Sequence, residues 1–138
     1  MSKVNKLKPP LNQGKKFEIK EGTIEVPHYN YPIFCFKHLH KDHNLDQCDT
    51  EEKKSLIEKI VILSQMTWQE IENSGRHGRG SEKIAITSLK PKCPAFITDD
   101  VKHLLALRFQ GQKPFLGHRD RFILHIIFID RNFTVYPH

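Results

Sequence analysis

The chain has few cysteines and no apolar run long enough to cross a membrane as a helix. Its three cysteines are odd in number and too few for a disulfide framework, so we expect a reducing, cytoplasmic environment. The longest near-continuous apolar run, from Phe122 to Ile129, is interrupted by His125, whereas a transmembrane helix needs about 20 apolar residues. Residues 1–6 lack the apolar stretch of a secretory signal. These absences argue against a secreted, disulfide-rich protein and against a membrane as partner.

Motifs for common cofactors are also missing. The sequence contains no Walker-type loop, nucleophile elbow, CxxC pair or dinucleotide fingerprint. We therefore expect chemistry that uses neither a small-molecule cofactor nor a metal ion. The length of 138 residues and the 38% content of hydrophobic residues fit one globular domain with an ordinary core.

Positive charge is concentrated in the second half of the chain. The net charge is +6, and residues 75–138 carry eleven basic and five acidic side chains, against five and eight in residues 31–74. A positive field on one half of a small protein suits a polyanionic partner such as RNA. The alternative is that these charges only keep the protein soluble.

Residues 1–16 contain five lysines and no acidic residue, which predicts a flexible basic arm. Residues 17–138 then form a single α+β domain. Within it, the alternation over residues 17–26 predicts an edge hairpin, and the aromatic-rich residues 31–39 predict a strand.

Two capping-box patterns mark the start of two helices. Asp49 is followed three residues later by Glu52, and Thr67 by Glu70. In each pair the glutamate side chain can accept a hydrogen bond from the backbone N–H of the N-cap residue. The pattern predicts helices over residues 50–65 and 67–74. We expect this helical hairpin to bury four apolar side chains against a sheet: Leu56, Ile60, Leu63 and Trp68.

The remaining elements are mostly strands. Residues 82–87 predict a strand, and residues 98–108 predict a capped helix, although residues 105–109 fit a strand equally well. Residues 115–129 give the strongest strand signal, and a strand over residues 133–136 would return after a turn at residues 130–132. The predicted fold is an antiparallel sheet with the helical hairpin packed on one face.

A two-residue turn at Arg131 and Asn132 would place candidate catalytic groups on one face. His125 would then face His138, and Ile127 would face Tyr136, because directly paired residues point to the same side of a sheet. The shared face would hold Arg119, Arg121, His125, Tyr136 and His138. Since Ile123, Ile127 and Ile129 lie on the same face, the alternative is that His125 is a core residue.

Such a face could cleave RNA without a metal. A neutral histidine would remove the proton of the 2′-hydroxyl, a protonated one would donate to the leaving oxygen, and arginine would neutralise the phosphorane. In a ribonuclease, two of the four candidate imidazoles should lie near Arg119 or Arg121; the four are those of His77, His118, His125 and His138. In a binding module the histidines should instead be scattered.

The glycine-rich residues 75–80 suggest a second cluster. Arg76, His77 and Arg79 lie on a backbone that can form an anion-binding nest, and Glu82 follows as a candidate general base. A solvated turn between a helix and a strand would use glycines in the same way. Lys113 and Arg131 are further candidates for contact with RNA.

The spacing of Cys35, His38, His43 and Cys48 matches a zinc knuckle. Against this, the second ligand is histidine instead of cysteine, and Cys35 lies within an apolar strand, where a buried free thiol is ordinary. We treat a zinc-dependent fold as the third alternative.

The order of elements and the closing residues resemble the RelE/YoeB-like toxin ribonucleases of toxin–antitoxin systems. The residues that carry the likeness are Gly117-His118-Arg119, the run from Arg121 to Ile129, and Val135-Tyr136-Pro137-His138. The resemblance implies a basic domain that cleaves messenger RNA without a metal and is blocked by an antitoxin protein. It also implies that Arg119 or Arg121 stabilises the phosphate, and that Tyr136 or His138 positions or protonates the scissile group. A non-enzymatic nucleic-acid-binding or inhibitor-type protein is the alternative function.

Overall fold

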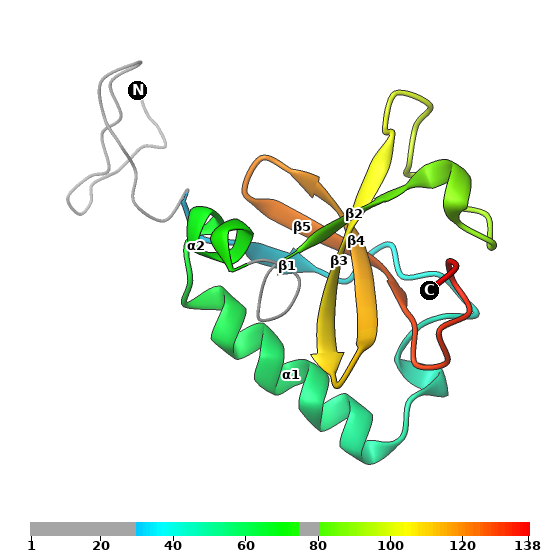
Figure 1. Ribbon diagram of the computed structural model, residues 1–138. Helices are drawn as coiled ribbons and strands as arrows, with labels where there is room; N and C mark the ends of the chain where they lie inside the picture. Colours follow the sequence, from blue (N-terminus) through cyan, green and yellow to red (C-terminus); the bar gives the residue numbers. More distant parts are fainter. Residues whose placement is uncertain (1–29, 75–80) are drawn as a thin grey trace, which may run out of the picture.

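The computed structural model describes residues 30–74 and 81–138. Its centre is a five-stranded sheet in the order β1-β5-β4-β3-β2, in which only β1 pairs in parallel, with β5 (Figure 1). The strands are β1 (Ile33–Cys35), β2 (Glu82–Ala85), β3 (His103–Gln110), β4 (Lys113–Asp120) and β5 (Ile123–Ile129). The predicted α+β class is therefore confirmed, and the sheet is antiparallel as predicted except for the β1–β5 pair.

The two helices begin at the predicted caps. α1 spans Thr50–Ser64 and α2 spans Trp68–Asn73, and both the Asp49–Glu52 and the Thr67–Glu70 capping boxes are formed. Each box satisfies backbone N–H groups that a helix start leaves unpaired, which fixes where the helix begins. Neither helix in the described part of the chain is long and apolar enough to cross a membrane.

Apolar side chains pack on both faces of the sheet. Leu56, Leu63 and Trp68 of the helices join one cluster with Leu107 and Phe115, as predicted for the helical hairpin. The second cluster lies on the opposite face, where residues 86–101 and 130–138 cover the strands (Figure 1). Its members include Leu116, Ile127, Phe128, Val135 and Tyr136.

β3 replaces the helix that the sequence allowed over residues 98–108. Leu104 and Ala106 belong to one apolar cluster, whereas Leu107 and Phe109 belong to the other. A strand that is buried on both faces has a continuous run of apolar residues instead of alternating apolar and polar ones. Such a run also contains apolar residues three and four positions apart, as an amphipathic helix does.

The predicted hairpin at residues 131–132 is wrong. The turn lies instead at Arg121 and Phe122, between β4 and β5, and His118 pairs directly with His125. Arg121 has a φ of +59°, a conformation that hairpin turns usually assign to glycine or asparagine. Residues 130–138 form no strand; they fold over the sheet and bury Val135 and Tyr136.

Gly117 permits a close approach between β4 and β5. The register shifts between Leu116 and Gly117, so that Ile127 is an extra residue on β5. A Cβ at Gly117 would lie 2.5 Å from the carbonyl oxygen of His125. Only glycine fits here without movement of the backbone.

Three predictions fall outside the described residues. They are the basic arm over residues 1–16, the hairpin over residues 17–26 and the glycine-rich cluster at 75–80 with Arg76, His77 and Arg79. The predicted strand over residues 31–39 is shorter, because only Ile33–Cys35 pair regularly with β5. The chain still follows β5 irregularly, through a hydrogen bond from the His40 N–H to the Ile127 carbonyl of 2.7 Å.

Candidate functional site

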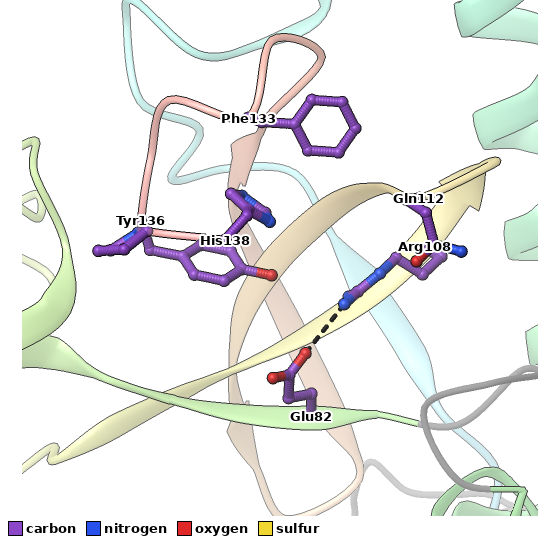
Figure 2. A pocket seen from close by; sticks show the side chains of 7 residues that line it. Glu82, Arg108, Gln112, Phe133, Tyr136 and His138 are labelled. Carbon is purple, nitrogen blue, oxygen red and sulfur yellow. Dashed lines mark hydrogen bonds and ion pairs between the residues drawn. The ribbon is translucent and has the colours of Figure 1, made fainter.

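A pocket of about 410 Å³ opens where β2, β3 and residues 133–138 meet (Figure 2). It brings together three of the predicted catalytic residues, which are Glu82, Tyr136 and His138. The other lining residues are Arg108, Gln112, Phe133 and Pro137. We define these seven residues as the tail pocket.

Arg108 and Glu82 form an ion pair in the tail pocket. The Arg108 Nη2 to Glu82 Oε1 distance is 2.9 Å, and the side chains are 15% and 30% exposed. The register pairs Glu82 with Ala106, so Glu82 and Arg108 point to the same face of neighbouring strands. An arginine among the apolar residues of β3 needs such a partner, because a buried unpaired charge is costly.

Two buried polar atoms of the tail pocket lack a hydrogen-bond partner within residues 30–74 and 81–138. They are the Tyr136 hydroxyl and Arg108 Nε. Tyr136 is only 5% exposed; burial raises the pKa of its hydroxyl, and the neighbouring Arg108 guanidinium offsets part of that rise. Figure 2 shows the hydroxyl and the guanidinium pointing toward the same space. Buried donors are almost always paired in proteins, so these two atoms, each with less than 1 Å² exposed, are unusual.

Asp130 holds His138 and the backbone beside it. The Asp130 carboxylate is buried, accepts hydrogen bonds from the N–H groups of Thr134 (2.8 Å) and Val135 (3.0 Å), and lies 3.6 Å from His138 Nε2. The His138 ring in turn lies against the Tyr136 ring, with centroids 4.1 Å apart. Asp130 thus orders the backbone beside His138, which is the only imidazole that lines the pocket among the described residues.

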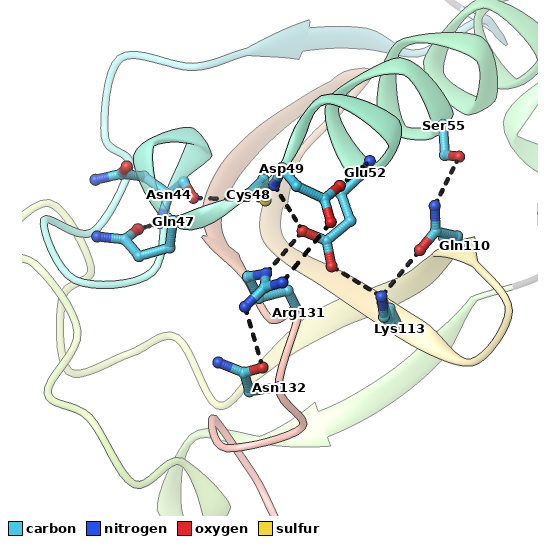
Figure 3. A network of polar contacts seen from close by, with 10 residues as sticks. All are labelled: Asn44, Gln47, Cys48, Asp49, Glu52, Ser55, Gln110, Lys113, Arg131 and Asn132. Atoms are coloured by element: carbon cyan, nitrogen blue, oxygen red, sulfur yellow. Dashed lines mark hydrogen bonds and ion pairs between the residues drawn. The ribbon is translucent and has the colours of Figure 1, made fainter.

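A second polar network anchors the segment that carries the tail pocket (Figure 3). Glu52 is 1% exposed and accepts a hydrogen bond of 2.7 Å from Arg131 Nε and one of 2.8 Å from Lys113 Nζ. Burial by itself would raise the pKa of Glu52, but these two hydrogen bonds outweigh it and hold the pKa at about 2. The predicted RNA contacts Lys113 and Arg131 are therefore part of a network that ties β4 and the segment after β5 to α1.

Arg119 and Arg121 lie outside the tail pocket. Arg119 stacks over the Trp68 ring at 4.1 Å and pairs with Glu72 at 2.8 Å, so its side chain belongs to the helix-covered face. Arg121 sits on the β4–β5 turn with its side chain 86% exposed. The predicted face with His125, Tyr136 and His138 does not form, because the turn lies ten residues earlier than expected.

His118 and His125 form a separate group with His38 around Phe96. The His118 and His125 ring centroids are 6.3 Å apart, and His38 stacks on Phe96 at 3.7 Å. Burial lowers the pKa of His125, and the neighbouring His118 and His38 lower it further. The two predicted imidazoles are adjacent, and His118 also lines a second pocket of about 470 Å³ together with Arg119, whereas His125 is not among the residues that line it.

The predicted zinc ligands point in different directions. Cys48 packs in the helix-side cluster, whereas His38 stacks on Phe96 on the other face. Across the described ranges, 30–74 and 81–138, no three His, Cys, Asp or Glu side chains are arranged to hold a metal ion.

The sequence reasoning missed Arg108, Gln112 and Phe133 as pocket residues. Arg108 had a usable signal, since it is a lone charge within the apolar run from Leu104 to Phe109, and such a charge is costly to bury unless it is paired or functional. Gln112 and Phe133 carry no local signal, because their place in the pocket depends on how residues 130–138 fold back over the sheet.

The tail pocket therefore offers a carboxylate, an imidazole, a phenol and a guanidinium within one concave site. This set can remove a proton, donate a proton and stabilise negative charge.

No protein-family model, no curated protein and no solved structure matches this chain significantly.

Proposed function

We propose that the protein is an endoribonuclease that cleaves RNA by acid–base chemistry of its own side chains in the tail pocket. The observation that supports the proposal is the convergence of Glu82, Arg108, Tyr136 and His138, with two of their buried donors unpaired among the described residues. A phosphate carries several acceptor oxygens and a negative charge, which match a phenol hydroxyl and a guanidinium.

In this reaction the Glu82 carboxylate takes the proton of the 2′-hydroxyl, and the 2′-oxygen attacks the adjacent phosphorus. The bond from phosphorus to the 5′-oxygen breaks, and the protonated His138 donates its proton to that oxygen. The products are a 2′,3′-cyclic phosphate and a 5′-hydroxyl. Arg108 and the Tyr136 hydroxyl stabilise the negative charge that develops on the phosphorane.

This assignment changes the roles that the resemblance implied. Arg108 takes the place expected for Arg119 or Arg121, and Glu82 replaces one of the two histidines. His138 keeps the proton-donating role implied by the likeness to RelE/YoeB-like toxins, whereas Tyr136 stabilises charge. On this proposal the protein acts on messenger RNA in the cytoplasm, and an antitoxin protein that covers the tail pocket is its expected inhibitor.

The experiment compares RNA cleavage by purified wild-type protein and variants in excess EDTA. We expect Glu82→Gln and His138→Gln to lower kcat by about 10²- to 10⁴-fold, the range for loss of a general base or acid. Arg121→Ala is the matched control, because it removes an exposed arginine outside the pocket, and we expect its kcat to stay within about threefold of wild type. An inactive wild type is assayed again with translating ribosomes.

If the protein cleaves neither free RNA nor messenger RNA on translating ribosomes, the proposal fails. Salt-dependent RNA binding by that inactive protein would then support the alternative function, a nucleic-acid-binding module.

A further inference from the structure

Phe133 presents an exposed aromatic ring at the rim of the tail pocket. Its side chain is 39% exposed. The ring stands perpendicular to that of His138, with an interplanar angle of 88° and centroids 5.0 Å apart. In Figure 2 it lies on the rim opposite Glu82. The exposed part of the Phe133 ring can therefore contact a ligand in the tail pocket.

The backbone at Phe133 adopts a conformation that phenylalanine disfavours. Its φ is +59°, in the left-handed region, where a bulky side chain is uncommon. The next residues are held in place, because Thr134 and Val135 donate their N–H groups to Asp130. Strained residues of this kind cluster at ligand-binding sites.

The groups around Phe133 fit a nucleotide. Arg108 and Gln112 line the same pocket, so a phosphate on Arg108 would leave the attached base within the pocket beside the Phe133 ring. Stacking on an aromatic side chain strengthens binding and is open to every base. Only an unpaired base offers its face in this way.

We propose that Phe133 stacks on the nucleobase next to the scissile phosphodiester, and that the site therefore selects single-stranded RNA. This inference rests on the proposed ribonuclease function. It adds a residue that determines substrate specificity and takes no part in proton transfer.

The test combines kinetics with a binding measurement that needs no cleavage. The kinetic substrate is a single-stranded RNA oligonucleotide, compared with the same strand in a duplex. The binding probe is a DNA oligonucleotide of the same sequence that carries one 2-aminopurine base. Because DNA lacks the 2′-hydroxyl, the proposed reaction cannot cut this probe. Stacking on an aromatic ring quenches the fluorescence of this base.

We expect Phe133→Ala and Phe133→Leu to raise KM by about tenfold to a hundredfold, with kcat within about threefold, and to abolish the quenching. Phe133→Trp should retain both, since it keeps a ring. Phe36→Ala is the control, because Phe36 is similarly exposed at 37% but does not line the tail pocket.

The inference is overturned if Phe133→Leu matches wild type in KM and quenching, or if wild type cleaves the duplex as fast as the single strand. These results leave the ribonuclease proposal intact. Conversely, a wild type that cleaves nothing refutes the ribonuclease proposal, while loss of quenching in Phe133→Leu would still show stacking at this residue.

Discussion

Replacement of the buried Glu52 by glutamine tests how the fold holds the tail pocket in place. Glu52 accepts hydrogen bonds from Arg131 and Lys113 while its carboxylate is 1% exposed. Glu52→Gln keeps the shape of the side chain and one oxygen acceptor but removes the negative charge. Lys113 and Arg131 then lose their closest counter-charge, although Arg131 keeps Asp49 at 4.0 Å, and the anchor of the segment after β5 on α1 is weakened.

The expected loss of stability is about 3 kcal/mol. Holding the pKa of Glu52 at about 2 instead of 4.5 corresponds to about 3 kcal/mol of folding free energy at neutral pH. Removal of one member of a buried ion pair typically costs 3–5 kcal/mol. Because Lys113 and Arg131 are 28% and 31% exposed and can be hydrated, we expect the low end of that range.

The assay is urea unfolding followed by fluorescence of Trp68, the only tryptophan of the chain, at several pH values. The unfolded state binds a proton at Glu52 below about pH 4.5, whereas the folded state resists protonation down to about pH 2. Wild type should therefore lose stability as the pH falls from 5 to 3, and Glu52→Gln should lose less. The exposed Glu51 provides a control, since Glu51→Gln should change stability by at most about 0.5 kcal/mol. A Glu52→Gln variant as stable as wild type at pH 7 would refute this reasoning.

Two further predictions concern the β4–β5 pair. Gly117→Ala should lower stability by about 1–3 kcal/mol and lower the Tm, because the new Cβ meets the His125 carbonyl at 2.5 Å; an unchanged Tm would contradict the close approach. The lowered pKa of His125, caused by burial and then by His118, means that the unfolded state binds more protons near pH 6, so stability should fall as the pH drops from 7 to 5. His125→Gln should flatten that dependence in urea unfolding curves, and an unchanged slope would show that His125 does not cause it.

Local signals predicted the helices well. Both capping boxes are short-range patterns, since each joins residues three apart, and the starts of α1 and α2 follow from them directly. The apolar side chains on the inner faces, Leu56 and Leu63, are buried as their spacing predicts. In β3, by contrast, burial on both faces removes the alternation that distinguishes a strand from a helix.

The hairpin prediction failed because register depends on the position of one turn. Arg121 occupies a positive-φ position without the glycine or asparagine that normally marks it, so the run from 115 to 129 reads as continuous. A misplaced turn changes every cross-strand partner, which is why His125 was paired with His138 instead of His118.

The candidate site was predictable in part. Glu82, Tyr136 and His138 were identified by residue type, but their convergence requires residues 130–138 to fold over the sheet. The Asp130 hydrogen bonds to Thr134 and Val135 and the Glu52–Arg131 contact produce that arrangement. The Asp130 contacts are local, but the Glu52–Arg131 contact joins residues 79 positions apart, and spacing along the chain does not reveal it.

The most direct test of the central claim is the chemical identity of the ends that the wild-type protein leaves on RNA. A defined oligonucleotide is incubated with the protein in excess EDTA, with translating ribosomes where RNA alone is not cut, and the fragments are weighed by mass spectrometry. Attack by the 2′-hydroxyl predicts a 2′,3′-cyclic phosphate or its 3′-phosphate hydrolysis product on one fragment and a 5′-hydroxyl on the other. It also predicts that a 2′-deoxy substitution at the cleaved position blocks the cut. A 5′-phosphate on the downstream fragment, or cleavage that persists without the 2′-hydroxyl, would contradict the account.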